Sequence, residues 1–315
     1  MSKCLITGCG GFIGSYLAEY LLQRDAAVYG IVHHDTKNLD HIKDKVTLFS
    51  CDIKDKDRVE AIVTEVKPDA IFHLAAQSRV EPSQPNPEKT FSINTLGTLS
   101  LLEAVRKAAI NPVNPVIELA CSSAEYGFSH QDEIPIDETH EFRPSSPYAV
   151  SKAAADLLGY FYWRAYHFPI IRVRLFNITG PRRMDDVCSD FTRGIVEIEK
   201  GHKDKLEPGN LEAIRDFTDV RDAVEALWRL VERGAPGEAY NLCSGRGYSM
   251  RQVLDMAISL SSCNIKVCPQ QRKLRSIDDP VYIGDNSKLK RLGWEPQIPL
   301  ERTLEDMLEH WRHQI

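Results

Sequence analysis

A glycine-rich turn between a strand pattern and a helix pattern is the feature that most constrains this chain. Cys4–Thr7 is typical of a short buried strand, Phe12–Arg24 has apolar residues at helical spacing, and TGCGGFIG (residues 7–14) joins them. Glycines let the backbone approach a diphosphate closely, and a helix N-terminus supplies N–H donors. The turn therefore predicts a dinucleotide-binding site at the first strand of a βαβ unit.

The alternation of strands and helices continues after this turn. Further strands are predicted at Ala26–Val32, Val46–Cys51, Ala70–Leu74, Val116–Cys121 and Ile170–Phe176, with helical patterns between them. Such alternation implies parallel strands with right-handed crossovers, so the expected fold is α/β, a Rossmann-type doubly wound parallel sheet. Ligands of such sheets bind beyond the carboxyl ends of the strands.

The pattern loosens after about residue 177 and indicates a smaller second lobe. Helices are predicted at Phe191–Lys200, Asp219–Glu232, Met250–Leu260 and Pro299–Arg312, with a strand at Ala239–Leu242. We expect residues 1–177 and 215–244 to form the cofactor-binding domain. Residues 178–214 and 245–315 would then form a discontinuous substrate-binding lobe.

Composition excludes several classes of protein. With 315 residues and a net charge of -6, the chain has no basic footprint for nucleic acid or anionic membrane. No apolar run reaches the roughly 18 residues of a membrane span, and the first residues lack a signal-peptide pattern. The eight cysteines form no CxxC pair and the ten histidines no HxxxH pair, so no metal is indicated. We expect a cytoplasmic enzyme with reduced, mostly buried thiols.

The end of the second strand bears on the choice between NAD and NADP. An acidic residue there binds the ribose 2′-hydroxyl of NAD, whereas Val32 occupies that place here and Asp35 comes three residues later. His33 and His34 could bind the 2′-phosphate of NADP. The alternative is that they are surface histidines without a role in binding. We expect NADP(H), with NAD as the alternative.

A tyrosine and a lysine four residues apart follow the fifth strand. Tyr148 and Lys152 would share one face of a helix, and a nearby ammonium moves the pKa of a tyrosine toward working pH. Ser122, at the end of the fifth strand, is placed to hydrogen-bond a carbonyl or alcohol. We predict Ser122, Tyr148 and Lys152 as catalytic residues of an oxidoreductase. The alternative for a lone YxxxK is an amphipathic helix, and a non-catalytic dinucleotide sensor is a further alternative.

The predicted cofactor-binding residues come from the glycine turn, from the ends of the next three strands and from the catalytic helix. They are Gly8, Gly11, Phe12, Ile13, Gly14, His33, Asp52, Ile53, Leu74, Ala75, Ala76, Tyr148 and Lys152.

Over nearly its whole length the chain resembles an extended short-chain dehydrogenase/reductase acting on nucleotide sugars. The resemblance rests on TGCGGFIG, HLAAQ (73–77), Asn94 in NTLGT, the Ser122 loop, YAVSK (148–152), LFN (175–177) and GPRR (180–183). The segment GNLEAIRDFTDVRD (209–222) is similar to the GDP-sugar branch, which contains GDP-mannose 4,6-dehydratase and GDP-6-deoxy-4-keto-mannose reductase. The resemblance implies a GDP-sugar substrate and a homodimer, with the helices around Asn94–Ala108 and Pro147–His167 pairing across a two-fold axis. Burial inside one subunit is the alternative for these helices.

The resemblance also assigns residues to the substrate. Arginines offer bidentate contacts to a sugar diphosphate, and in this branch Arg275 and Asp278 match positions that contact the nucleotide. The predicted substrate-binding residues are Ser123, Glu125, Asn177, Arg182, Asn210, Arg215, Arg275 and Asp278.

One residue position distinguishes the dehydratases of this branch from the reductases. Dehydratases place an acid/base carboxylate two residues after the active-site hydroxyl, and here that position is Ala124. Glu125 is adjacent, but successive residues of an extended segment point to opposite faces. The sequence therefore favours a 4-keto reductase that yields a GDP-6-deoxyhexose such as GDP-rhamnose. GDP-mannose 4,6-dehydratase is the main alternative, and an NDP-sugar 4-epimerase is a weaker one.

Overall fold

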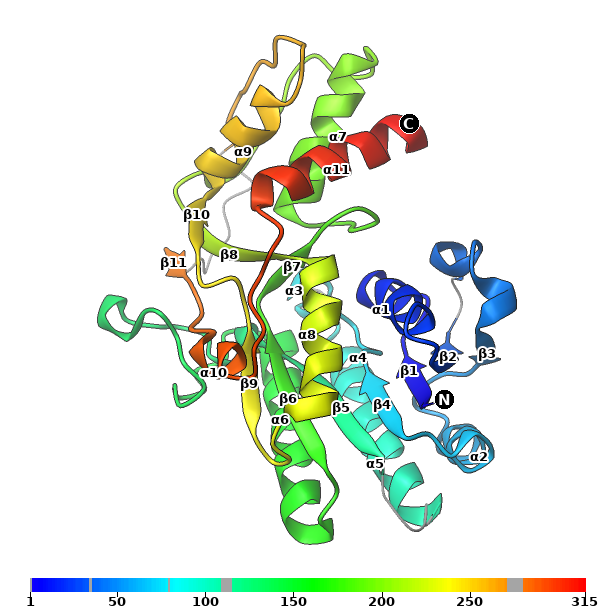
Figure 1. The fold of residues 1–315 in the computed structure, drawn as a ribbon. Coiled ribbons are helices and arrows are strands. Elements are labelled where there is room, and N and C mark those ends of the chain that lie inside the picture. Colours follow the sequence, from blue (N-terminus) through cyan, green and yellow to red (C-terminus); the bar gives the residue numbers. More distant parts are fainter. Residues whose placement is uncertain (1, 34–35, 79, 109–114, 271–279) are drawn as a thin grey trace.

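Seven parallel strands form the large sheet in the computed structural model, which describes residues 2–33, 36–78, 80–108, 115–270 and 280–315 (Figure 1). Across the sheet the order is β3 (Thr47–Ser50), β2 (Ala27–Val32), β1 (Lys3–Thr7), β4 (Ala70–His73), β5 (Val116–Ser122), β6 (Ile170–Leu175) and β9 (Ala239–Leu242). Every paired neighbour in this sheet is parallel. The predicted Rossmann-type doubly wound sheet is confirmed.

Helices cover both faces of the large sheet. On one face, α1 (Phe12–Leu22) and α8 (Val220–Arg233) share a hydrophobic core with the strands. On the other, α2 (Lys56–Val66), α5 (Gly97–Ala108) and α6 (Pro147–Tyr166) build a second core. The start of α6 follows from local chemistry, because the Ser146 hydroxyl accepts from the N–H of Ala149 and proline occupies the first turn.

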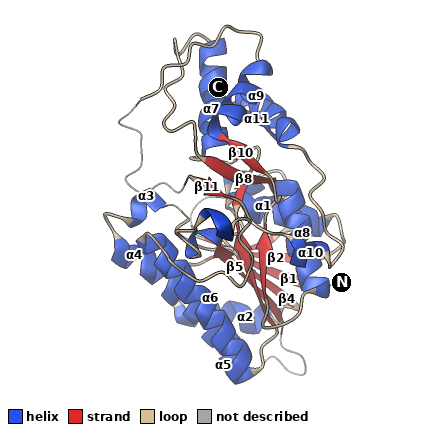
Figure 2. Cartoon of the chain, turned by 90° about the vertical axis from the view of Figure 1, so that its left-hand side faces the viewer, coloured by secondary structure: helices blue, strands red, loops and turns tan. Residues whose placement is uncertain are grey.

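The smaller lobe contains a second sheet (Figure 2). Strand β8 (Ile214–Asp219) lies between β10 (Gly247–Ser249) and β11 (Val281–Tyr282) and also pairs with β7 (Asn177–Thr179). The helices α7 (Val187–Glu199), α9 (Met250–Ser259) and α11 (Leu300–Gln314) pack into a core of their own beside it. The expected division placed residues 215–219 with the large domain. The structure places them in the small sheet, because all backbone pairing partners of β8 belong to it.

Shorter elements complete the chain. These are the helices α3 (Val80–Ser83), α4 (Pro87–Phe91) and α10 (Ser287–Lys290), together with a π-helical turn at Ser92–Leu96 before α5 and 3-10 turns at Lys37–Leu39, Lys43–Lys45, Ser123–Glu125 and Gln131–Glu133. Six of the eight cysteines are buried free thiols, as the sequence predicted for most of them. None of the described helices is long and apolar enough to cross a bilayer.

Glu118 is a fully buried carboxylic acid in the middle of β5. Its register partners are Phe72 and Ile171, whose side chains belong to the core shared with α1 and α8. Within the described part of the chain, neither carboxyl oxygen of Glu118 has a hydrogen-bond partner. Burial raises its pKa well above the ordinary value of 4.5, since the ionised form is poorly solvated there.

This burial predicts a pH-dependent stability. The folded protein holds a proton on Glu118 at pH values where the unfolded chain has lost it, so stability falls as pH rises above about 4.5, by about 1.4 kcal/mol per unit. The fall ends once the folded-state carboxyl ionises. Glu118→Met should therefore raise the thermal midpoint more at pH 8 than at pH 5, as measured by calorimetry. A gain of equal size at both pH values would contradict an ionisation effect.

Candidate active site

The glycine turn after β1 is a close-packed backbone cradle. The N–H groups of Gly8 and Cys9 donate to Ile31 O at 2.9 and 3.2 Å, which anchors the turn to the end of β2. Gly8 has a φ of 72°, and a Cβ there would lie 2.9 Å from the backbone of Ala75. A Cβ on Gly14 would lie 2.3 Å from Gly8 O. The turn therefore requires glycine for both conformation and space.

The first turn of α1 is open to an anion. Its N-cap is Gly11, which provides no side-chain acceptor, and the first turn contains no acidic residue. The free N–H groups and the positive end of the helix dipole fit a cofactor diphosphate. Asn38 donates to Gly10 O at 3.1 Å and so ties the segment after β2 to the turn.

Predicted cofactor residues also follow β2, β3 and β4, whose carboxyl ends lie at the same edge of the sheet as the end of β1. His33 Nε2 lies 3.6 Å from the carboxylate of Asp52, the second residue after β3, while His34 and Asp35 fall outside the described residues. Ile53 packs against Gly97 at the start of α5. The segment after β4, Leu74 to Ala76, lies against the glycine turn through Gly8 and Ala75.

A buried hydrogen-bond chain fixes that segment. The Thr7 hydroxyl accepts from Ala75 N at 3.2 Å and lies 2.8 Å from His73 Nδ1, while His73 Nε2 lies 2.9 Å from the Thr98 hydroxyl. Thr98 donates to Asn94 O at 2.6 Å, so its oxygen accepts from Nε2–H and Nδ1 accepts from Thr7. Burial, with the Lys152 charge as a second cause, lowers the pKa of His73 to about 3, consistent with a neutral ring.

The predicted catalytic residues come from the end of β5 and from α6. Ser122 ends β5, and its hydroxyl oxygen accepts from Ala124 N at 3.2 Å, which leaves its O–H free to donate. Lys152 is almost fully buried and donates to Ala120 O at 2.6 Å, two residues before Ser122 on the same strand. Tyr148 lies one turn before Lys152 and is half-buried.

Hydrogen bonds from the π-helical turn fix the backbone of α6 near Tyr148. The Asn94 amide donates to the Ser151 hydroxyl at 2.9 Å and to Gln77 O at 3.1 Å, and it accepts from Gln77 N at 2.8 Å. Ser151 in turn donates to Tyr148 O at 2.7 Å. These bonds connect the segment after β4 with the first turns of α6.

The structure corrects the expected backbone at Glu125. The segment Ser123–Glu125 is a 3-10 turn and not extended, so Glu125 folds back under Ser122. Its carboxylate is fully buried and accepts from Ser122 N at 2.7 Å. Burial is the first cause of a pKa raised well above the ordinary carboxyl value, and the like charge of Asp156 is the second. This carboxyl group faces the interior, which argues against the expected role of Glu125 as a substrate ligand.

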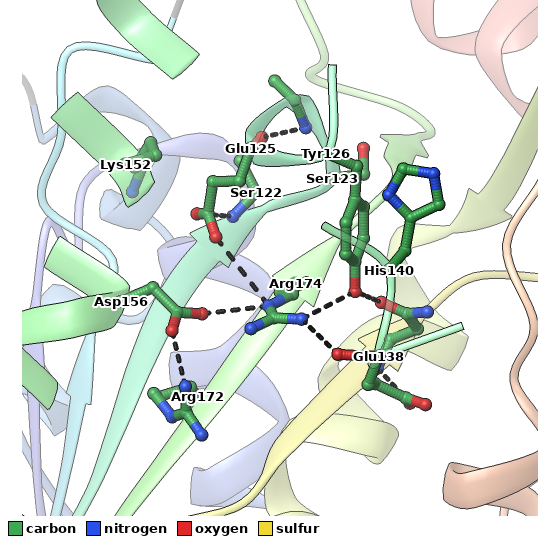
Figure 3. Close-up of polar contacts among 12 residues, drawn as sticks. Ser122, Ser123, Glu125, Tyr126, Glu138, His140, Lys152, Asp156, Arg172 and Arg174 are labelled. Atoms are coloured by element: carbon green, nitrogen blue, oxygen red, sulfur yellow. Dashed lines mark hydrogen bonds and ion pairs between the residues drawn. The ribbon is translucent and has the colours of Figure 1, made fainter. Parts of the chain in front are cut away.

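Behind Ser122 lies a buried cluster of charges (Figure 3). Asp156, on α6, accepts from Arg172 at 2.6 Å and from Arg174 Nε at 3.0 Å. Arg174 Nε also lies 3.8 Å from Glu125 Oε2. Arg174 Nη1 donates to the Tyr126 hydroxyl at 3.0 Å and to Glu138 O at 2.9 Å. The cluster joins β6, α6 and the turn after β5.

Three of the predicted substrate residues lie where the turn after β5 contacts the small sheet. The Tyr282 hydroxyl, from β11, donates to Ser123 O, and Tyr282 is the register partner of Arg215 on β8. Asn177 donates to Asp216 O at 2.8 Å on the same strand. Ser123, Asn177 and Arg215 are thus connected through β8 and β11.

The remaining predicted substrate residues are placed elsewhere or not described. The Arg182 guanidinium pairs with Glu19 at 2.6 Å and lies 4.4 Å from the centre of the Tyr16 ring, so it packs on α1, which argues against the expected contact with a sugar diphosphate. Asn210 accepts from Glu212 N at 3.0 Å in the loop before β8. Arg275 and Asp278 lie outside the described residues.

Sequence reasoning missed the residues that hold this site together. Asp156 lies on the same face of α6 as Tyr148 and Lys152, one helical turn further on. The i, i+4 spacing of the three residues could have indicated this. Two arginines in the apolar strand segment IIRVRL were a second signal, since charges in a buried strand need partners. Asp216 had no such signal. It accepts from Ser244, Gly245 and Gly284, which are distant in sequence.

The architecture and the site together are those of the short-chain dehydrogenase/reductase class in its extended, two-lobed form. The sequence profile of the GDP-mannose 4,6 dehydratase family matches residues 5–307, and the chain belongs to this family.

Its relatives include enzymes of both chemistries. GDP-mannose 4,6-dehydratase of Vibrio cholerae is 32% identical, over 99% of this chain and 96% of that protein. GDP-6-deoxy-D-mannose reductase of Pseudomonas aeruginosa is 28% identical, over 99% and 98%. The structure of RMD from Pseudomonas aeruginosa complexed with NADPH superposes with a TM-score of 0.87 at 27% identity and covers 100% of both chains. Family membership therefore leaves dehydratase and reductase both open.

Proposed function

We propose that this protein is an NADP(H)-dependent reductase of the C4 ketone of GDP-4-keto-6-deoxy-mannose, which yields a GDP-6-deoxyhexose such as GDP-rhamnose. The observation that carries the proposal is the turn after Ser122. Ala124 offers only a methyl group, and the Glu125 carboxylate is buried with Arg174 behind Ser122. Neither residue supplies the carboxylate that dehydration needs near C5 and C6, whereas reduction of the ketone needs none.

Three side chains of the protein would each have a separate role in such a reduction. Reduced nicotinamide, when bound, supplies the hydride for C4. The free O–H of Ser122 would donate to the ketone oxygen, and Tyr148 would give that oxygen its proton. The Lys152 ammonium would stabilise the tyrosinate that remains and hold the nicotinamide ribose. NADP(H) is the proposed cofactor, supported by the NADPH-bound relative and by Val32 at the place of an NAD-type acid, with NAD as the alternative.

Two substrates distinguish the alternatives. Purified protein given NADPH and GDP-4-keto-6-deoxy-mannose should consume NADPH in proportion to a GDP-6-deoxyhexose product, followed by absorbance and chromatography. Conversion of GDP-mannose to the 4-keto sugar without net cofactor consumption would replace the reductase with the dehydratase. Interconversion of C4 epimers would indicate the epimerase.

We also propose that the protein is a homodimer through α6. Large apolar side chains along this helix are exposed, among them Leu157 at 58%, Tyr160 at 45% and Phe161 at 51%. Pairing this face with a second copy would remove it from water. Sedimentation should give a dimer for the parent and a monomer for the double variant Leu157→Glu/Phe161→Glu. The matched control is Met184→Glu, exposed on another segment, which should remain dimeric. A monomeric parent would contradict the proposal.

A further inference from the structure

We propose that Glu125 is a positioning residue: from the interior it fixes the Ser122 hydroxyl and links it, through Arg174 and Asp156, to the helix that carries Tyr148 and Lys152. The role rests on the proposed function, because it concerns how the Ser122 and Tyr148 sides of that site are held together. It is distinct from proton transfer, since the Glu125 side chain is fully buried behind Ser122.

The first half of the link is the capping of the 3-10 turn. Glu125 Oε1 accepts from Ser122 N at 2.7 Å, while the Ser122 hydroxyl accepts from Ala124 N at 3.2 Å. Both hydrogen bonds involve Ser122, so together they fix its backbone and the direction of its hydroxyl. Without the Glu125 acceptor, a buried N–H would lose its partner and the turn would lose half of its cap.

The second half is a guanidinium that hydrogen-bonds to Asp156 and lies next to Glu125. Arg174 Nε lies 3.0 Å from Asp156 Oδ2 and 3.8 Å from Glu125 Oε2. Asp156 lies four residues after Lys152 and eight after Tyr148, on the same face of α6. The guanidinium therefore hydrogen-bonds to the helix that carries the other two catalytic residues and lies beside Glu125 Oε2, which has no hydrogen-bond partner among the described residues.

The position of this cation is itself fixed. Arg174 Nη1 donates to Tyr126 and to Glu138 O, and the Tyr126 hydroxyl donates to the Asn241 side chain at 2.7 Å (Figure 3). Possible ligand atoms of Cys121, Glu125 and Asp156 lie within 4.8 Å of one another, and Arg174 supplies the positive charge beside them. Because these contacts hold Arg174 in place, we expect a substitution of Glu125 to displace the turn at Ser122 and not Arg174.

A double-mutant cycle with Ser122 tests this role. Glu125→Leu should lower kcat by about 10–100-fold with KM little changed, because a misplaced hydroxyl weakens the transition state more than binding. In the Ser122→Ala background the same change should lower kcat by less than about twofold, since the hydroxyl that Glu125 places is gone. Glu125→Gln, which keeps an oxygen acceptor for Ser122 N, should retain more activity than Glu125→Leu.

The matched control is Glu118→Gln, which alters another fully buried carboxyl on the opposite face of β5 and should leave kcat unchanged. Losses that add in the cycle, or a folded Glu125→Leu protein with the kcat of the parent, would overturn the proposal. If Glu125→Leu does not fold, Glu125→Met, which also lacks the acceptor for Ser122 N, takes its place in the cycle under the same criterion.

One readout needs no substrate. Amide hydrogen exchange of the peptide containing residues 122–126 should be faster in Glu125→Leu than in the parent and unchanged in Glu118→Gln. This separates the two proposals: if the ketone is not reduced, exchange still tests Glu125, and the cycle is run on GDP-mannose dehydration, which also uses Ser122. Unchanged exchange in Glu125→Leu would overturn the positioning role whichever reaction the protein catalyses.

Discussion

Tyr148→Phe should lower turnover by about 10²–10⁴-fold while NADPH affinity stays within about twofold of the parent. Phenylalanine keeps the ring, which is half-buried on α6, and removes only the hydroxyl that would protonate the ketone oxygen. Lys152 keeps its bond to Ala120 O, so the ribose side of the site is unchanged. The measurements are steady-state kcat and a fluorescence titration with NADPH.

The matched control is Tyr166→Phe, which removes the hydroxyl of a tyrosine in the last turn of the same helix, where its side chain is 42% exposed. Its turnover should equal that of the parent. If Tyr148→Phe also retained full turnover, Tyr148 would be removed from the mechanism and the dinucleotide sensor would return as the alternative.

Asp156→Ala should destabilise the protein by about 3–5 kcal/mol. Its carboxylate is fully buried and accepts from both Arg172 and Arg174, so its removal leaves two guanidinium groups with fewer partners in the interior. The expected loss is large because a buried charge without its counter-charge is poorly solvated. Urea denaturation followed by circular dichroism measures it.

A surface ion pair provides the comparison. Glu225→Ala removes the i, i+4 partner of Arg229 on α8, where both side chains are partly exposed, and should change stability by less than about 0.5 kcal/mol. Equal effects of the two substitutions would mean that Arg172 and Arg174 find other partners when Asp156 is lost, and would contradict the role given to this cluster.

The local patterns of the sequence predicted much of the fold. The glycine turn, the apolar strands and the helical spacing each depend on residues close in the chain, and the predicted elements lie within a few residues of the observed ones. The YxxxK spacing likewise required only that Tyr148 and Lys152 lie on a helix, which they do. These features could be predicted because each depends only on residues that are close together in the sequence.

The error at Glu125 shows where local reasoning failed. An extended segment was expected after β5, but hydrogen bonds of Ser122 with Glu125 and Ala124 close a 3-10 turn instead. Polar side chains that bond nearby backbone offer the chain an alternative to extended structure. Alternation of faces therefore did not apply, and the carboxylate turned into the interior.

The sequence by itself determined the class of fold, and it predicted the strand ends at which the site forms and Ser122, Tyr148 and Lys152 as its catalytic residues. Only the tertiary structure decided which polar groups from distant parts of the chain meet. Asp156 reaches Arg174 because α6 packs across β5 and β6, and Tyr282 reaches Ser123 because β11 pairs with β8. Arg182 pairs with Glu19, 163 residues away in the chain. Such partners are set by packing and strand register, since a polar group removed from water needs a partner within reach, whatever the place of that partner in the sequence.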